Sequence, residues 1–226
     1  MPKLSFFFLL LLFPFFAFCQ EEPKSSVQSF RPPKEKPLIR KNGDITLGKI
    51  SLYKKTKEIR FPAKVTVRSG VLEFLISSYR GSLHESLLVA DISPYQLQIM
   101  LYLLGADNKK KAKMKGKRGT LINVDIEWQN DGQKKRMAIE NLIKDSRTDF
   151  VMSRKGFYFV GTSFVNNIPQ AEGSGNIACL YSRVDTVLDV ADKDSHLDTI
   201  FYANTDFYSP GPNQEVTVIL SIREEK

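Results

Sequence analysis

The stretch IRFPAKVTVR, residues 59–68, decides which class of fold this chain adopts. Apolar residues occupy every second position and polar residues or a proline lie between them. This pattern is typical of a β-strand with one buried face and one solvent-exposed face. Pro62 falls on the polar face and has no N–H for a sheet hydrogen bond, so we expect an edge position or a bulge there. Gly70 ends this pattern, and the denser apolar run of residues 71–77 predicts a central strand.

Alternation of the same kind recurs along the rest of the chain. Residues 122–128 are apolar and polar in turn, Asp131-Gly132 is a strong hairpin signal, and residues 133–138 form the expected returning strand. Later strand candidates are residues 156–160, 176–181, 199–203 and 215–222. Strands therefore outnumber helices, and the sequence shows no alternating βαβ series of the kind that builds a doubly wound nucleotide-binding fold.

One segment shows clear helical periodicity, over residues 94–104. Ser93 is a suitable N-cap, Pro94 fits the first turn, and Gly105 stands where a C-terminal glycine usually ends a helix. Between them, apolar residues recur at spacings of three and four: Leu97, Met100, Leu101 and Leu104. We expect a mainly β or α+β fold, namely a single sandwich-like domain over residues 43–226, with an antiparallel or mixed sheet and this one substantial helix.

The first 19 residues have the pattern of a secretory signal peptide. An uncharged apolar run covers residues 4–18, which is shorter than the about 20 residues that a helix needs to cross a bilayer. Cleavage before Gln20 would leave residues 20–42 as a proline-rich, charged linker ahead of the domain. We therefore expect an exported protein, periplasmic or extracellular, with no transmembrane span after cleavage. Two alternatives stay open: an uncleaved anchor, and a lipid attached to Cys19.

The positive charge of the chain is concentrated in one segment. The whole chain carries +8, removal of Lys3 with the signal peptide leaves +7, and seven cations in one loop supply all of that. They are Lys109, Lys110, Lys111, Lys113, Lys115, Lys117 and Arg118. Such a loop is a candidate for binding anionic envelope components, for example lipid head groups or acidic polysaccharide. It lacks the interleaved aromatic residues that stack on bases, so we expect no nucleic-acid partner, and a solvated connecting loop is the alternative.

His84 and Glu85 are the first candidates for chemistry. The chain has only two histidines, and one that is flanked by a carboxylate and a hydroxyl is a candidate general base or metal ligand, because imidazole titrates near neutral pH. The alternative is that His84 and Glu85 cap or pack a loop while Leu87 and Leu88 fill the core. The sequence leaves open whether residues 83–88 are extended or helical, and this decides where His84 points.

A second candidate is an acidic stretch near the C-terminus. Its members are Asp185, Asp189, Asp192, Asp194, His196 and Asp198. Clustered carboxylates suit calcium outside the cell, but the spacing and glycine of a calcium-binding EF-hand loop are missing, so a solvated acidic loop is the default interpretation. A metal site that joins His84, Glu85 and His196 is a weaker hypothesis. Cys179 lies among apolar neighbours and is expected to be a small core residue rather than a reactive thiol.

The sequence contains none of the common local motifs of catalysis or nucleotide binding. Walker-type glycine loops, HExxH, CxxC and GxSxG are all missing, and no cofactor follows from the residues present. Our leading hypothesis is therefore a non-catalytic envelope domain that binds a ligand or partner. The alternatives are a metal-binding, hydrolytic or redox-associated enzyme that uses His84 and Glu85, and docking on anionic surfaces through the loop from Lys109 to Arg118.

Several segments in a fixed order resemble a known family. They are KEIRFPAKV (57–65), LHESLL (83–88), YLLG (102–105), VDIEW (124–128), FVGTSF (159–164), GNIA (175–178) and EVTVIL (215–220). Together they are similar to the YdjY-like domain of exported bacterial proteins, over about residues 45–222.

The resemblance implies an exported β-rich domain, and it implies a redox context in the envelope, because some members look fused to iron–sulfur modules or encoded beside them. This chain has no set of cysteines that could hold such a cluster. The family supplies no catalytic residues to carry over. Since LHESLL contains ionisable groups, the resemblance adds interest to His84 and Glu85 without giving them a role. The lysine-rich loop departs from the family pattern.

Overall fold

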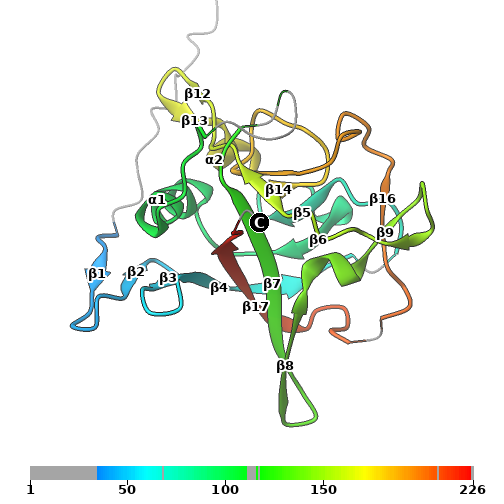
Figure 1. The fold of residues 1–226 in the computed structure, drawn as a ribbon, viewed down its shortest axis with the longest axis horizontal. Helices are drawn as coiled ribbons and strands as arrows, with labels where there is room; N and C mark the ends of the chain where they lie inside the picture. Colours follow the sequence, from blue (N-terminus) through cyan, green and yellow to red (C-terminus); the bar gives the residue numbers. More distant parts are fainter. Residues whose placement is uncertain (1–34, 68, 111–115, 117, 208, 225–226) are drawn as a thin grey trace, which may run out of the picture.

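The protein is described here by a computed structural model, which covers residues 35–67, 69–110, 116, 118–207 and 209–224 (Figure 1). The strands are β1 (Leu38–Ile39), β2 (Ile45–Leu47), β3 (Ile50–Tyr53), β4 (Glu58–Val65), β5 (Phe74–Ser77), β6 (Ser86–Val89), β7 (Leu121–Asn130), β8 (Gln133–Ala138), β9 (Ile143–Asp145), β10 (Phe150–Val151), β11 (Phe157–Phe159), β12 (Phe164–Val165), β13 (Ile168–Pro169), β14 (Asn176–Cys179), β15 (Leu188–Val190), β16 (Phe201–Ala203) and β17 (Glu215–Ile222). The helices are α1 (Pro94–Leu104) and α2 (Gln170–Ser174), with the 3-10 helices η1 (Leu83–Glu85) and η2 (Ile139–Leu142).

Most of the described strands belong to one twelve-stranded sheet that closes on itself. Eight of them follow one another around a ring in the order β4-β17-β7-β11-β15-β14-β5-β6, and β6 pairs back onto β4. Two neighbouring pairs, β14–β15 and β5–β6, are parallel, and the other pairs around the ring are antiparallel. The predicted mainly β domain with a mixed sheet and one substantial helix is confirmed. The closure of the sheet is an additional finding.

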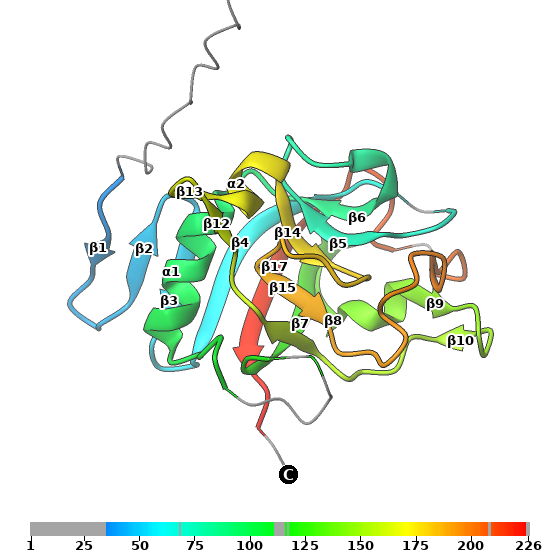
Figure 2. The same ribbon diagram turned by 90° about the horizontal axis from the view of Figure 1, so that it is seen from above.

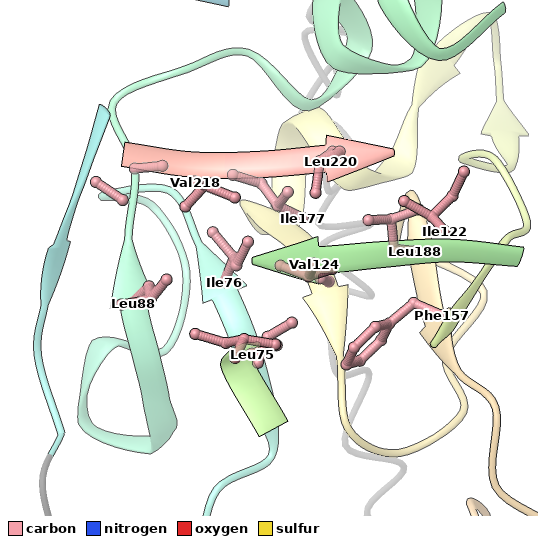
Figure 3. Packing of buried hydrophobic residues seen from close by; sticks show 14 of the residues in the cluster. Leu75, Ile76, Leu88, Ile122, Val124, Phe157, Ile177, Leu188, Val218 and Leu220 are labelled. Carbon is pink, nitrogen blue, oxygen red and sulfur yellow. The ribbon is translucent and has the colours of Figure 1, made fainter. Parts of the chain in front are cut away.

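Apolar side chains fill the interior of the ring. Figure 3 shows them pointing toward one another from strands around the ring, among them Ile76, Leu88, Val124 and Leu220. The strand that the sequence places most firmly, β4, contributes its alternate apolar residues to this core, as its period of two requires. Because the interior is packed with side chains, a bound molecule has to sit outside the ring.

Helix α1 begins and ends where its local signals predict. The Ser93 hydroxyl accepts a hydrogen bond from the Gln96 amide at 3.1 Å, Pro94 is the first helical residue, and Gly105 ends the helix with φ of 98°. The helix packs against β3 and β4 at one side of the ring, whereas the small sheet of β9, β10 and β16 lies at the opposite side (Figure 2).

Two further local predictions are confirmed, one for the Asp131-Gly132 turn and one for Pro62. Asp131 and Gly132 have φ of 50° and 75°, which is the conformation of the tight hairpin turn between β7 and β8. Pro62 faces Thr217 of β17. On the other side of β4, β3 pairs only up to Arg60 and β6 pairs only from Lys64 onward. Pro62 therefore lies at a locally unpaired edge, where a missing N–H breaks no sheet hydrogen bond.

The N-terminal predictions fall largely outside the described residues. The signal peptide of residues 1–19, its cleavage site and Cys19 all precede residue 35. Of the predicted linker, residues 20–42, the last part is described, and Leu38 and Ile39 form the short edge strand β1 on β2. In the part of the chain that the structure describes, no helix is both long enough and apolar enough to cross a membrane.

Candidate functional site

His84 and Glu85 lie on the one-turn helix η1, immediately before β6. The segment 83–88 is therefore helical at its start and extended at its end. The His84 side chain is 79% exposed, and its Nε2 lies 3.5 Å from Oε1 of Glu85. Leu87 and Leu88 are buried in the core. The pair is thus an exposed contact between neighbouring residues, with no described group that holds the imidazole in a fixed orientation.

Glu85, Glu73 and Asp198 form a small group of carboxylates. Glu73 was not among the candidates drawn from the sequence. Burial raises the pKa of Glu73, and the carboxylates of Glu85 and Asp198 raise it further, against the opposing effects of Tyr181 and Arg183. The segment around Glu85 and the end of the acidic stretch therefore meet near Glu73. The available signal was Glu73 itself, a charged residue inside the dense apolar run of residues 71–77.

Much of the acidic stretch is used in structural ion pairs. Arg147 donates to Asp145, to Asp192 at 2.8 Å and to Asp194 at 2.7 Å, and Lys155 approaches Asp192 at 3.1 Å. Asp192 is 3% exposed, and the hydrogen bonds from Arg147 hold the pKa of its carboxyl far below its usual range. These carboxylates already have cationic partners, so the arrangement does not resemble a calcium site.

Asp185 is paired in the same way. Arg183 Nε donates to it at 2.7 Å and Asn176 Nδ2 at 3.0 Å. The hydrogen bonds and charge of Arg183 lower the pKa of the Asp185 carboxyl, although burial acts in the opposite direction. Among the described residues, no group of three or more His, Cys, Asp or Glu side chains could hold a metal ion. The geometry therefore gives no support to a metal site that joins His84, Glu85 and His196.

Three members of the acidic stretch, Asp189, Asp192 and His196, meet at a hollow that we call the polar groove. It has a volume of about 640 Å³ and is lined by Gly116, Val160, Gly161, Thr162, Ser163, Ser182, Arg183, Val184, Asp189, Asp192, Lys193, Ser195 and His196. His196 and Lys193 are exposed at its rim, whereas Asp189 is only 4% exposed. The groove therefore combines buried carboxylates, serine hydroxyls and two accessible cationic or titratable groups.

Sheet geometry places Asp189 outside the ring. Its neighbours in β15, Leu188 and Val190, point into the core, so the side chain between them points outward. In the register of the sheet Asp189 lies beside Tyr158 of β11 and Cys179 of β14, and all three are buried. Cys179 is fully buried, as expected for a small core residue, and this burial raises the pKa of its thiol far above its usual range.

Hydrogen bonds fix the walls of the polar groove. The hydroxyls of Ser182 and Ser195 lie 2.8 Å apart, and the Ser182 amide donates to the Ser195 carbonyl at 2.6 Å. On the opposite wall, the Thr162 amide donates to Gln98 of α1 at 2.7 Å, and the Thr162 hydroxyl accepts from the Ala171 amide of α2 at 2.8 Å. The groove is therefore attached to both α-helices and to two loops.

The lysine-rich segment reaches this groove at one described residue. Gly116 lines it, Lys109, Lys110 and Arg118 are exposed, and Lys111, Lys113, Lys115 and Lys117 lie outside the described residues. The segment ends at Gly119, whose amide donates to the Lys110 carbonyl at 2.8 Å. A Cβ at Gly119 would lie 1.8 Å from the Phe159 carbonyl oxygen, so only glycine fits there.

The ring of strands, its filled interior and its single long helix define a small closed-sheet β domain. The family model described as the YdjY domain matches residues 50–221, which is most of the chain. The chain therefore belongs to the YdjY domain family, and the resemblance drawn from its sequence segments is confirmed. No curated protein and no solved structure matches it.

Proposed function

We propose that the protein is an exported envelope domain, periplasmic or extracellular, that binds a small polar ligand in the polar groove and releases it unchanged. The observation that carries the proposal is the groove itself, a hollow with hydrogen-bonded walls outside a filled core. Its buried serine and aspartate groups are largely engaged in bonds that maintain its shape, which suits binding better than proton transfer. Ligand sites of this kind are concave and largely pre-formed.

The rim of the groove indicates the chemistry of the ligand. Lys193 supplies an exposed ammonium group and His196 an exposed imidazole, both next to serine hydroxyls. Ammonium and imidazole N–H groups donate hydrogen bonds, so the matching ligand carries acceptor oxygens such as a carboxylate. Among the described residues that line the groove, Val160 and Val184 supply the apolar side chains and most of the others carry polar groups, which suits a water-soluble ligand.

Thermal unfolding with defined probes tests this proposal. We expect at least one of succinate, L-glutamate and D-glucuronate to raise Tm by about 5 °C at a hundredfold excess over its Kd, because ligand that binds only the folded state adds about 2.7 kcal/mol there. Lys193→Ala with His196→Ala should abolish the shift. Lys54→Ala, which removes an exposed lysine near the β3–β4 turn, should retain it.

Mass spectrometry after incubation decides between binding and catalysis. The proposal expects the bound probe to be recovered unchanged. Conversion of the probe would contradict this proposal and support the enzyme hypothesis. If no probe raises Tm and the double variant behaves as the parent protein, ligand binding in the polar groove is wrong.

Two alternatives remain hypotheses. An enzyme that uses His84 and Glu85 gains no support from their exposed position, and His196 lies in the polar groove instead. Docking on an anionic envelope component through Lys109 to Arg118 rests largely on residues outside the described part of the chain. Binding to acidic vesicles that weakens between about 50 and 200 mM salt would support docking, because salt screens exposed charges over this range.

A further inference from the structure

Strand β8 leaves one edge of the large sheet open. Strand β7 pairs with β17 along one side. On its other side, β7 pairs with β11 at Leu121 and Ile122 and with β8 from Asp125 onward. Within the described residues β8 has no strand beyond it. The β7–β8 hairpin projects from the body of the ring (Figure 1), so a further strand has access to this edge.

The hairpin turn fixes which backbone groups face outward. In a two-residue turn the closing pair, here Asn130 and Gln133, is hydrogen bonded, and hydrogen-bonded pairs alternate with the others along the ladder. Lys135 and Met137 therefore direct their backbone groups toward β7, whereas Lys134 and Arg136 direct theirs outward. Among the described residues, Lys134 and Arg136 make no backbone hydrogen bond outside the sheet.

The charges on β8 do not protect this edge in the usual way. Exposed lysines commonly discourage pairing at a sheet edge. Here Lys134 is bound to Glu127 at 2.7 Å, and Arg136 is bound to Glu58 and Asp125, both at 2.8 Å. These two side chains are held on the same face as the acids, and their charge is compensated there.

The opposite face of β8 borders a hollow that we call the edge groove, of about 490 Å³. It is lined by Trp128, Lys135, Arg136, Met137, Asp206, Phe207 and Ser209. The Trp128 indole donates to the Ser209 hydroxyl at 2.8 Å, which fixes the ring as one wall. Lys135 is exposed, with no ion pair among the described residues, and Met137 and Phe207 are half-buried. The edge groove therefore presents one available cation beside an apolar floor.

We propose that β8 binds an extended segment of a partner protein as an additional antiparallel strand. Directly opposed residues share a face, so the position opposite Lys135 takes an acidic residue and the position opposite Met137 takes an apolar one. In antiparallel pairing the apolar residue precedes the acidic residue by two positions. Lys135 is in a non-hydrogen-bonded pair with the added strand, where opposed side chains lie closest, so its ammonium group is well placed for the carboxylate.

A capped peptide, Ser-Thr-Leu-Thr-Glu-Thr-Ser, tests the proposal by NMR on the isotope-labelled domain. We expect saturable shifts and slower hydrogen exchange at the amides of Lys134 and Arg136. Lys135→Glu should weaken binding about tenfold, since attraction becomes repulsion at an exposed pair. A peptide with Lys in place of Glu should bind this variant better than the parent. Lys55→Glu, in the β3–β4 turn, is the matched control and should bind as the parent does.

A backbone-blocked peptide separates strand addition from simple charge attraction. The central threonine would face Arg136, so methylation of its amide nitrogen removes a ladder hydrogen bond and should abolish binding. Equal binding of the methylated peptide would overturn the proposal. It would also be overturned if the two amides were unaffected at about 1 mM peptide, which is a free energy of binding weaker than about −4 kcal/mol. Protection of the same amides in the free protein at high concentration would identify a second copy of the chain as the occupant instead.

Discussion

Glu140 places a carboxyl group inside the protein without a described partner. The residue lies in η2, is 2% exposed, and neither carboxylate oxygen has a hydrogen-bond partner among the described residues. Burial raises the pKa of this carboxyl, and its own backbone amide and the charge of Arg154 oppose that effect only in part. The ionised form is therefore unfavourable in the folded state.

Replacement of Glu140 by methionine should stabilise the protein, and the gain should depend on pH. Because the folded pKa is raised, the contribution of Glu140 to stability is most favourable below its unfolded pKa and is lost as pH rises through the folded pKa. We expect Glu140→Met to add about 1–3 kcal/mol to the free energy of unfolding at pH 8 and clearly less at pH 4. Urea denaturation at both pH values measures this difference.

Glu140→Gln is the control for the origin of the effect. It removes the titration and keeps a buried polar group, so the Gln and Met variants should differ in stability by the same amount at pH 4 and pH 8, with the Gln variant less stable because a desolvation penalty remains. An equal loss of stability for the Met variant at pH 4 and pH 8 would show that the carboxyl has a favourable partner.

At the scale of elements, the start of α1 depends on a residue from α2. The Glu172 carboxylate accepts from the Ser93 hydroxyl at 2.8 Å and from the Tyr95 amide at 3.1 Å. A negative charge at this end also complements the helix dipole. Glu172→Ala should therefore lower the free energy of unfolding by about 1 kcal/mol, measured by urea denaturation. Glu172→Gln keeps an acceptor and should lose less.

An exposed acid elsewhere provides the comparison for this prediction. Glu215, whose side chain is 81% exposed, forms an ion pair with Lys64 at 3.6 Å, so Glu215→Ala should change stability by no more than about 0.5 kcal/mol. If both alanine variants lose the same small amount, the contact between α2 and α1 does not support the helix.

The elements that could be predicted are those specified by neighbouring residues. The bounds of α1 follow from Ser93, Pro94 and Gly105, and the β7–β8 turn follows from Asp131-Gly132. The pairing of β6 with β4 and that of β14 with β5 connect distant segments, and alternation within a strand does not say which partner it takes. The sandwich-like description therefore contained most strands of the ring, but not β15, and it left residues 83–88 and the closure of the sheet open.

The candidate site was predictable only in fragments for the same reason. His196 and the aspartates near it were candidates, but Thr162, Ser182 and Lys193 reach the polar groove through tertiary contacts and carry no local motif. His84 had the stronger local signal, yet the 3-10 turn that precedes β6 directs it into solvent. Composition around a residue indicates its chemistry, but the packing of distant segments decides whether it faces a hollow.

At the scale of the whole molecule, the closed ring depends on the last strand of the chain. Strand β17 pairs with β4 on one side and with β7 on the other. It buries four apolar residues, Val216, Val218, Ile219 and Leu220. Full burial of such side chains contributes about 1.5–3 kcal/mol each, which together approaches the about 5–15 kcal/mol that stabilises a whole domain.

Truncation after Gln214 should therefore abolish folding, whereas removal of the N-terminus up to Asn42 should not. The first change opens the ring and exposes two long strand edges. Among the described residues, the second removes β1, whose two residues are exposed and pair with β2 alone, and the Glu35 carboxylate that accepts a hydrogen bond from Gln96. Circular dichroism and size-exclusion chromatography of the two truncated proteins measure the outcome, with Tm of the N-terminal truncation expected within a few degrees of the parent. A cooperative thermal transition in the protein that lacks β17 would mean that β4 and β7 do not need it as a bridge. The other strands would then form a core on their own, and β17 would close the ring by adding to that core.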